Sequence, residues 1–261
     1  MKYSYKIVLA VIAFAISFPL SSSAQFNNFP KFLKRFEIGG SYAMSSAEYR
    51  VKQRFLSQDY SIDTTIKFNM NSVAGIGGML GTYVPLSRLG QKSILALNID
   101  LMYNALVWDK DVTVYSPTGG TVTNSLTGGT LMVGMPVGLD FKFGCDAVGR
   151  KDVRFCTTLG GGVLPSFAMT SIDDVNDIAG EFGVSPYVKA EVGMFTGICW
   201  KIRAMYSFGV IDEMSTLMDK TVKSDFGQSN TQLIQKSSLN LSLILMPFSF
   251  TWGTQEWWNT F

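Results

Sequence analysis

Residues 131–144 have the sequence LMVGMPVGLDFKFG. The odd-numbered positions of this stretch are all apolar, and the even-numbered positions are mostly small or charged. A period of two is typical of a β-strand, because successive side chains of a strand point to opposite faces. The stretch therefore predicts a strand with one wholly apolar face and one small or polar face.

The same alternation recurs along the chain. Clear copies cover residues 94–108, 182–195, 200–210 and a last strand from 239, and weaker copies cover about 35–45, 70–84 and 153–170. In the last strand the register shifts at Met246 and Pro247, which predicts a β-bulge or kink there. Beyond it, Phe248, Phe250 and Trp252 continue the apolar face. We count eight strands, and no segment after the N-terminal region shows a helical period.

The N-terminal segment has the pattern of an export signal. Two lysines precede an apolar run at residues 7–20, and Ser22 and Ala24 occupy a small-x-small cleavage site. The alternative is a membrane anchor, but the run is shorter than the roughly 20 residues that span a bilayer as a helix. We expect residues 1–24 to be a signal peptide and residues 25–261 to form one mature domain.

Strand length and loop pattern predict the architecture. Several strands span about 13 to 18 residues, whereas strands of soluble proteins usually have about 5 to 6 residues and a tilted membrane strand needs roughly 9 to 11. Long connections, at about 45–69, 109–126 and 211–237, alternate with shorter ones, as external loops and periplasmic turns do in transmembrane barrels. The sequence predicts an all-β fold, a transmembrane eight-stranded antiparallel up-and-down β-barrel. A soluble barrel with an apolar ligand would instead need its apolar face inside.

These features resemble the small eight-stranded outer-membrane β-barrels of Gram-negative bacteria, the OmpA/OmpX type and the related outer membrane protein β-barrel families. The resemblance rests on the signal ending in Ser23-Ala24-Gln25, on glycine-punctuated strands such as Gly134–Gly144 and Thr157–Phe167, and on Phe261 at the end of the sequence. It implies location in the cell outer membrane and contact with its lipid and lipopolysaccharide. Residues 253–261 depart from the pattern, because they follow the last strand as a short periplasmic tail.

The polar face of the strands carries a nearly balanced set of charges. An eight-stranded barrel has an interior just wide enough for side chains, so charges that point inward are expected to pair. The predicted lumen charge network comprises Glu37, Asp100, Asp140, Lys142, Arg154, Lys189, Glu191, Lys201 and Arg203. We interpret it as an ion-paired plug; the alternative is an ion path or a catalytic acid/base set.

Three cysteines in an exported chain suggest one disulfide and one remaining thiol. Cys145 and Cys156 bracket a predicted periplasmic turn, which makes them the candidate disulfide. Cys199 would then be free to join a periplasmic or other envelope protein partner. The alternative is three reduced thiols. The spacing is unlike CxxC and favours neither a redox motif nor a thiolate metal site, so no metal or cofactor is expected.

Composition excludes several function classes. The chain contains no histidine, which removes Ser-His and Cys-His nucleophile pairs and every histidine-containing metal site. We therefore predict that it is not an enzyme. Without Lys2 and Lys6, 22 − 2 = 20 basic residues face 20 acidic ones, so no net charge favours nucleic acid as a partner.

The sequence favours a non-enzymatic integral outer-membrane barrel, a structural or interaction component of the cell envelope with a plugged polar lumen. The alternative is a narrow channel, or a barrel subunit of an envelope transport or secretion machine. Arg50, Lys52 and Arg54 in the first predicted loop form a small basic patch, which suits the phosphates of lipopolysaccharide.

Overall fold

The computed structural model describes residues 33–56, 61–115, 121–172, 175–208, 217–224 and 227–253. Their strands are β1 (Glu37–Leu56), β2 (Ser61–Gly90), β3 (Ser93–Tyr115), β4 (Thr121–Gly134), β5 (Val137–Gly144), β6 (Phe155–Ile172), β7 (Val175–Phe195), β8 (Cys199–Phe208), β9 (Leu217–Ser224) and β10 (Gly227–Met246). The short helices are η2 (Leu33–Arg35), α2 (Cys145–Val148) and η3 (Ser249–Thr251). No helix in these ranges is long and apolar enough to cross a membrane.

Two of the sequence predictions concern residues that the structure does not describe. The signal peptide at residues 1–24 and residues 254–261 of the tail lie outside the described residues. The domain boundary between residues 24 and 25 therefore stays a prediction.

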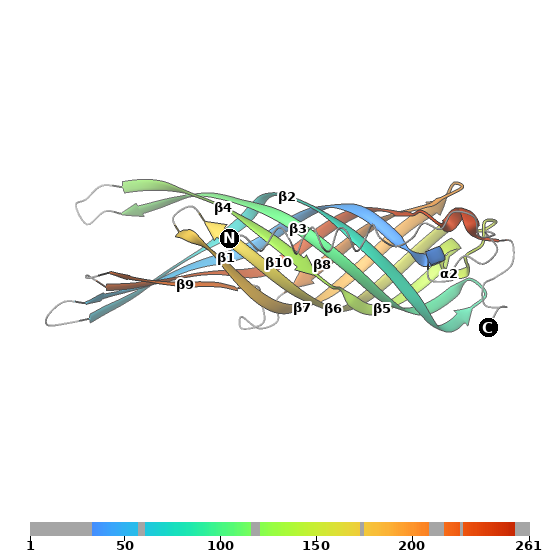
Figure 1. The fold of residues 1–261 in the computed structure, drawn as a ribbon, viewed down its shortest axis with the longest axis horizontal. Coiled ribbons are helices and arrows are strands. Elements are labelled where there is room, and N and C mark those ends of the chain that lie inside the picture. The colour runs from blue at the N-terminus through green and yellow to red at the C-terminus, as the bar shows by residue number, and fades with distance from the viewer. Residues whose placement is uncertain are drawn as a thin grey trace, which may run out of the picture. The chain divides into compact units, whose positions relative to one another are not determined.

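The strands close into an antiparallel barrel (Figure 1). Neighbouring strands pair around the ring, and β1 pairs with β10 to close it. β4 and β5 both lie between β3 and β6, so they are two halves of one barrel strand. β8 and β9 likewise pair with successive parts of β10. The ring thus has eight strands, which confirms the predicted fold class.

The interruption between β4 and β5 lies at Met135 and Pro136. Proline has no backbone N–H to give to a ladder. The neighbouring strands nevertheless bond to this point, because Asp100 N–H donates to Pro136 O at 3.0 Å and Met135 N–H donates to Pro165 O at 2.9 Å. The barrel wall is therefore continuous across the break.

The alternation that predicted the fold is present in the structure. Between residues 131 and 144 every even-numbered residue is buried, and every odd-numbered residue is exposed or half-buried. β3 alternates in the same way, and β8 alternates at every position, with its odd-numbered residues buried. The predicted orientation, with the large apolar residues outside, is therefore confirmed.

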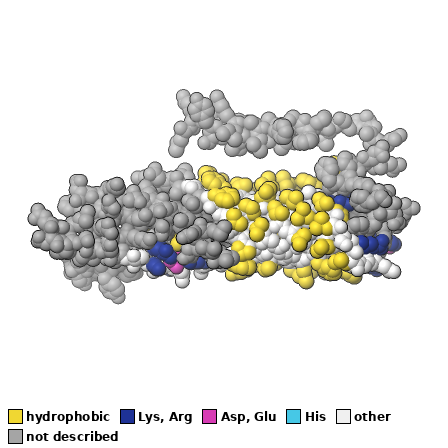
Figure 2. Space-filling model, turned by 90° about the horizontal axis from the view of Figure 1, so that it is seen from below, with side chains coloured by type: hydrophobic (Ala, Val, Ile, Leu, Met, Phe, Trp, Pro, Cys, Tyr) yellow, Lys and Arg dark blue, Asp and Glu magenta, His cyan; other side chains and the backbone are white. Residues whose placement is uncertain are grey.

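The outward apolar side chains form a belt around the barrel. On the face drawn in Figure 2, hydrophobic side chains gather in a band across the described part of the barrel. Exposed members of the belt on different strands include Met44, Leu80, Leu101, Leu139, Leu159, Val188, Ile202 and Leu243. A closed antiparallel barrel with such a belt is built to face lipid.

The prediction of three long loops is wrong for most of their residues. β1 continues to Leu56 and pairs with β2 from Ser61, β3 continues to Tyr115, and β9 and β10 occupy much of 211–237. Alternation identifies a strand only where its two faces meet different surroundings. Beyond the apolar belt both faces of a hairpin can meet water, so these strand extensions carry no apolar period.

The predicted continuation of the last strand through Phe248, Phe250 and Trp252 is also wrong. β10 ends at Met246, and η3 follows. Pro247 cannot extend the ladder, and Ser249 Oγ caps the strand end by donating to Met246 O at 2.7 Å. Trp252 is only 2% exposed and stacks on Phe195, with 5.6 Å between ring centroids.

The turn after β5 brings a short helix into the barrel end. Gly144 has φ 99° and Gly149 has φ 63°, a backbone region that L side chains rarely adopt. Between these glycines, all four residues of α2 are buried. The turn that follows β5 therefore places a cysteine and an aspartate inside the end of the barrel where β5 and β8 meet the turns.

We expect Leu139→Arg to destabilise the barrel by about 2 to 4 kcal/mol, because this side chain is 50% exposed in a belt that faces lipid. Urea unfolding from lipid vesicles measures the loss. Ser125→Arg, at an exposed position on the outer part of β4, is the matched control and should cost little. Equal unfolding midpoints for Leu139→Arg and the wild type would contradict the orientation.

Candidate functional site

Nine charged side chains meet inside the barrel, and we call them the lumen cluster. They come from five strands and from α2, and each is buried. The members are Glu37, Asp100, Asp140, Lys142, Asp146, Lys189, Glu191, Lys201 and Arg203. Because inward positions alternate with lipid-facing ones, closing the barrel brings these groups together.

Arg203 on β8 joins three other strands through one guanidinium. Its Nη1 lies 2.6 Å from Asp100 Oδ2, its Nη2 lies 2.8 Å from Glu37 Oε2, and its Nε lies 2.6 Å from Glu191 Oε1. The planar guanidinium presents five N–H donors in a fixed fork. Arg203 therefore links β1, β3 and β7 at one point of the lumen.

Lys201 and Lys189 extend the pairing to both sides of Arg203. Lys201 Nζ lies 3.1 Å from Glu191 Oε2 and 3.3 Å from Asp146 Oδ2. Lys189 Nζ lies 2.9 Å from Asp140 Oδ2 and 3.7 Å from Glu191 Oε1. Glu191 is thus shared by four cations, since Arg203 and Lys142 also contact it.

Lys142 and Tyr83 lie at the α2 side of the cluster. Lys142 Nζ is 3.3 Å from Asp146 Oδ2 and 4.3 Å from the centroid of the Tyr83 ring. The Tyr83 hydroxyl donates to the backbone carbonyl of Asp146. The cluster has five carboxylates and four cations, a sum of −1, and the buried Arg35 guanidinium lies 6.0 Å from the same ring. Tyr83 therefore joins the charged cluster to α2 and η2.

Two glycines make room for the carboxylates. A Cβ on Gly81 would lie 1.9 Å from Asp100 Oδ1, and a Cβ on Gly160 would lie 2.1 Å from Asp140 Oδ1. Each glycine faces its aspartate across a strand pair, Gly81 with Asp100 and Gly160 with Asp140. Any larger residue would push these carboxylates out of their positions.

The structure brings together eight of the nine residues that the sequence placed in the lumen. Arg154 is the exception, and its inward placement is wrong. It is exposed and precedes the first residue of β6, so the strand alternation does not yet apply to it. Asp146 is the residue that sequence reasoning missed, because it belongs to a four-residue helix with no period. The glycines at 144 and 149, which flank that helix, were the available signal.

The three cysteines also lie together, beside the cluster. Their thiols are free and buried, so the structure contains no disulfide between Cys145 and Cys156. Cys145 Sγ and Cys199 Sγ are 4.0 Å apart, and all three Sγ atoms lie within 4.8 Å of one another. Cys199 is 0% exposed, which does not suit its expected role as a thiol open to a partner.

The basic patch lies on β1 and not in a loop. Arg50 Nη2 contacts Glu48 Oε1 at 2.5 Å, and this hydrogen-bonded guanidinium holds the pKa of the Glu48 carboxyl below its usual range. The side chains of Lys52 and Arg54 are outside the described part. Contact of this patch with lipopolysaccharide therefore stays a proposal.

No family model and no curated protein matches the sequence. Three solved structures are similar to this chain. The outer membrane protein OprG from Pseudomonas aeruginosa has 10% identity and a TM-score of 0.41, and the match covers 80% of this chain and 94% of that chain. The outer membrane protease OmpT from Escherichia coli has 8% identity, a TM-score of 0.35 and coverage of 80% and 96%, and Neisserial surface protein A has 10% identity, a TM-score of 0.32 and coverage of 80% and 99%. The likeness is at most one of fold, and we draw nothing about activity from it.

The closed ring, the apolar belt and the polar interior define the class. A barrel with these three properties is an outer-membrane β-barrel protein. The predicted location in the cell outer membrane agrees with this architecture.

Removing Arg203 tests the cluster energetically. Arg203→Met leaves Glu37, Asp100 and Glu191 short of a shared cation, and breaking a buried pair of this kind costs about 3 to 5 kcal/mol. Urea unfolding in lipid vesicles measures the loss. Arg154→Met removes an exposed arginine and serves as the control, with a change expected below about 0.5 kcal/mol. If both variants unfold like the wild type, the arginine does not hold the cluster.

Proposed function

We propose that the protein is a non-enzymatic structural or interaction component of the outer membrane, with a lumen closed by ion pairs. The observation that carries this proposal is the complete pairing of the lumen cluster. Each of its nine charged side chains has an opposite charge within 4.0 Å, and all are shielded from solvent. Groups arranged in this way occupy the space through which a solute would have to pass.

A small cavity beside the lumen cluster supports the same proposal. A cavity of about 10 Å³ lies between Asp100, Arg203 and Met79. This volume is enough for about one water molecule. A conducting pore needs an unbroken file of water, so a space of this size favours a closed barrel over the narrow channel that the sequence left as an alternative.

The burial and pairing of the lumen carboxylates favour a role other than catalysis. A general acid or base must reach the substrate proton, yet every cluster carboxylate is buried against a cation. Ser166 and Ser207 are buried as well, and the chain has no histidine to activate a hydroxyl. Among the residues that the structure describes, the lumen therefore offers no accessible nucleophile–base pair of the usual type.

The outer hairpins are the parts best placed for interaction. Beyond Met44 in the belt, β1 continues for twelve residues to Leu56, which is about 40 Å along the strand. In this region β2, β1, β10 and β9 pair in that order, and residues 61–71 of β2 have no partner on β3 among the described residues (Figure 1). Edges of this kind accept an additional strand from a partner. We propose that envelope proteins or lipopolysaccharide bind at this end.

Ion conductance in a planar bilayer tests the closed lumen. We expect the refolded wild type to insert without steady channels, because paired charges fill the lumen. Heat-modifiable gel mobility confirms folding, and protection of the barrel from protease confirms insertion. Steady single channels from folded, inserted protein would contradict the closed lumen and favour the channel alternative.

A further inference from the structure

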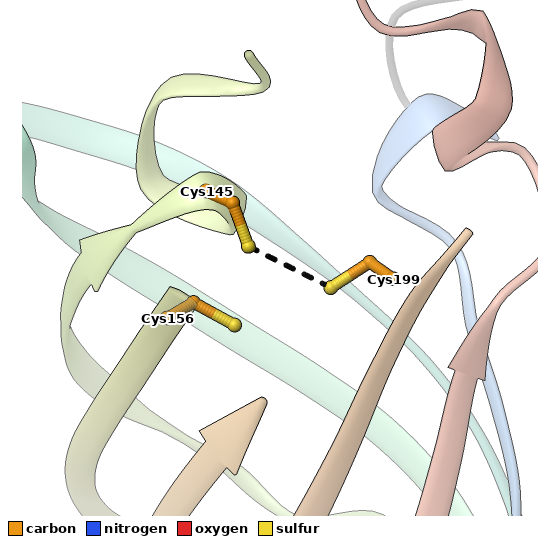
Figure 3. Close-up of side chains that lie close together, drawn as sticks. All are labelled: Cys145, Cys156 and Cys199. Atoms are coloured by element: carbon orange, nitrogen blue, oxygen red, sulfur yellow. Dashed lines mark hydrogen bonds between the residues drawn. The ribbon is translucent and has the colours of Figure 1, made fainter. Parts of the chain in front are cut away.

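Three cysteines that are far apart in the sequence meet at the end of the barrel that holds α2. Cys145 is the first residue of α2, Cys156 is the second residue of β6, and Cys199 is the first residue of β8. Figure 3 shows their side chains pointing toward one another from these three elements. The three Sγ atoms lie within 4.8 Å of one another. The chain has no other cysteine, so the fold gathers every thiol at one point.

The spacing of the sulfur atoms suits a bound metal ion. A metal–thiolate bond is about 2.3 Å long, so three thiolates around a trigonal ion lie about 4 Å apart. The observed separation of Cys145 Sγ and Cys199 Sγ is 4.0 Å. A disulfide would require about 2.0 Å and would use only two of the three groups. The arrangement as a whole therefore fits a shared ligand.

The surroundings of the thiols select a soft ion. Cys145, Cys156 and Cys199 are packed in one buried cluster with the apolar residues Ile94, Ala96, Ala147, Met246 and Trp252, and with Tyr83. Soft thiolate ligands favour Cu(I) and zinc, but a structural zinc ion takes four ligands. No fourth histidine, cysteine or carboxylate joins the three thiols in the described ranges. A monovalent copper ion accepts three sulfur ligands and needs no water.

The backbone holds the three groups in place before any ion binds. Gly144 sets the direction of Cys145, and Cys199 N–H donates to Ser249 Oγ at 2.7 Å. A Cβ on Gly193 would lie 2.9 Å from Cys156 Sγ, so the glycine leaves space for that sulfur. Because the three cysteines are already held in position, little conformational entropy is lost when the ion binds.

We propose that Cys145, Cys156 and Cys199 form a trigonal thiolate site for one Cu(I) ion. On binding, three sulfur–copper bonds form, the three thiol protons pass to the buffer, and no electron is transferred. The stacked rings of Phe195 and Trp252 pack against the site and keep water from the thiolates. The sequence spacing predicted no metal site, because the three cysteines belong to elements that only the closed barrel brings together.

Copper binding is measured on the refolded full-length chain, kept reduced with a phosphine. Cu(I) is titrated against a chromophoric Cu(I) chelator. We expect one copper ion per chain to remain after buffer exchange, with the ultraviolet charge-transfer absorption of Cu(I)–thiolate bonds, which methionine thioethers do not give. Cys145→Ser, Cys156→Ser and Cys199→Ser should each weaken binding about 100-fold or more, because loss of a ligand costs at least as much as the largest losses seen when a partner of a ligand is substituted.

Met44→Leu is the matched control, because it removes an exposed sulfur on the lipid-facing side of β1 and should leave copper binding unchanged. Heat-modifiable gel mobility reports the folding of each variant. If the serine variants do not fold, the copper stoichiometry and the charge-transfer absorption of the wild type decide the question alone.

Three results would overturn the proposal. The first is protein purified from membranes without reductant that contains a disulfide between any two of the three cysteines. The second is copper retained equally by the folded serine variants, which would assign it to methionines. The third is tighter retention of Zn²⁺ than of Cu(I) in parallel titrations.

Discussion

The pairing of β1 with β10 is the interaction on which the rest of the structure depends. In lipid, an open sheet edge leaves backbone N–H and C=O groups without partners, at a cost of several kcal/mol for each group. The register from Ile38↔Leu245 to Phe55↔Gly227 removes that edge over nearly all of β1. Closing eight strands also fixes a narrow interior, and inward side chains can then meet only one another. The ion pairs of the lumen are a consequence of closure.

We infer that those ion pairs contribute more to specificity than to net stability. Desolvation of buried charges offsets much of their attraction, and breaking one pair costs more than making it gains. A shift of one residue in strand pairing would turn Glu191 and Arg203 toward lipid and the apolar Val192 and Ile202 inward. The cluster therefore penalises wrong registers strongly. Arg203 is central to this effect because it binds groups from three other strands.

The sequence predicted the parts of the fold in which lipid and lumen lie on opposite sides of a strand. Residues 131–144 and eight of the lumen charges follow from that alternation alone. Outside the belt the two faces of a strand meet similar surroundings, so the sequence predicts loops where the strands extend toward Leu56 and Tyr115. The sequence does not predict the burial of Asp146 and places Trp252 on the wrong face, because the burial of these residues depends on the short helices α2 and η3, which have no apolar period. The meeting of the three cysteines depends on ring closure, which sequence separation does not reveal.

The reactivity of lysines toward an amine-acylating reagent is the most direct test of a lumen closed by ion pairs. Folded protein in lipid vesicles is labelled for increasing times, and each lysine is followed by mass spectrometry. Lys142, Lys189 and Lys201 are buried in the cluster, whereas Lys92 and Lys151 are exposed in turns. The account predicts rapid labelling of the two exposed lysines and protection of the other three until the barrel unfolds. Labelling of the three lumen lysines at comparable rates would show an open, hydrated interior and contradict it.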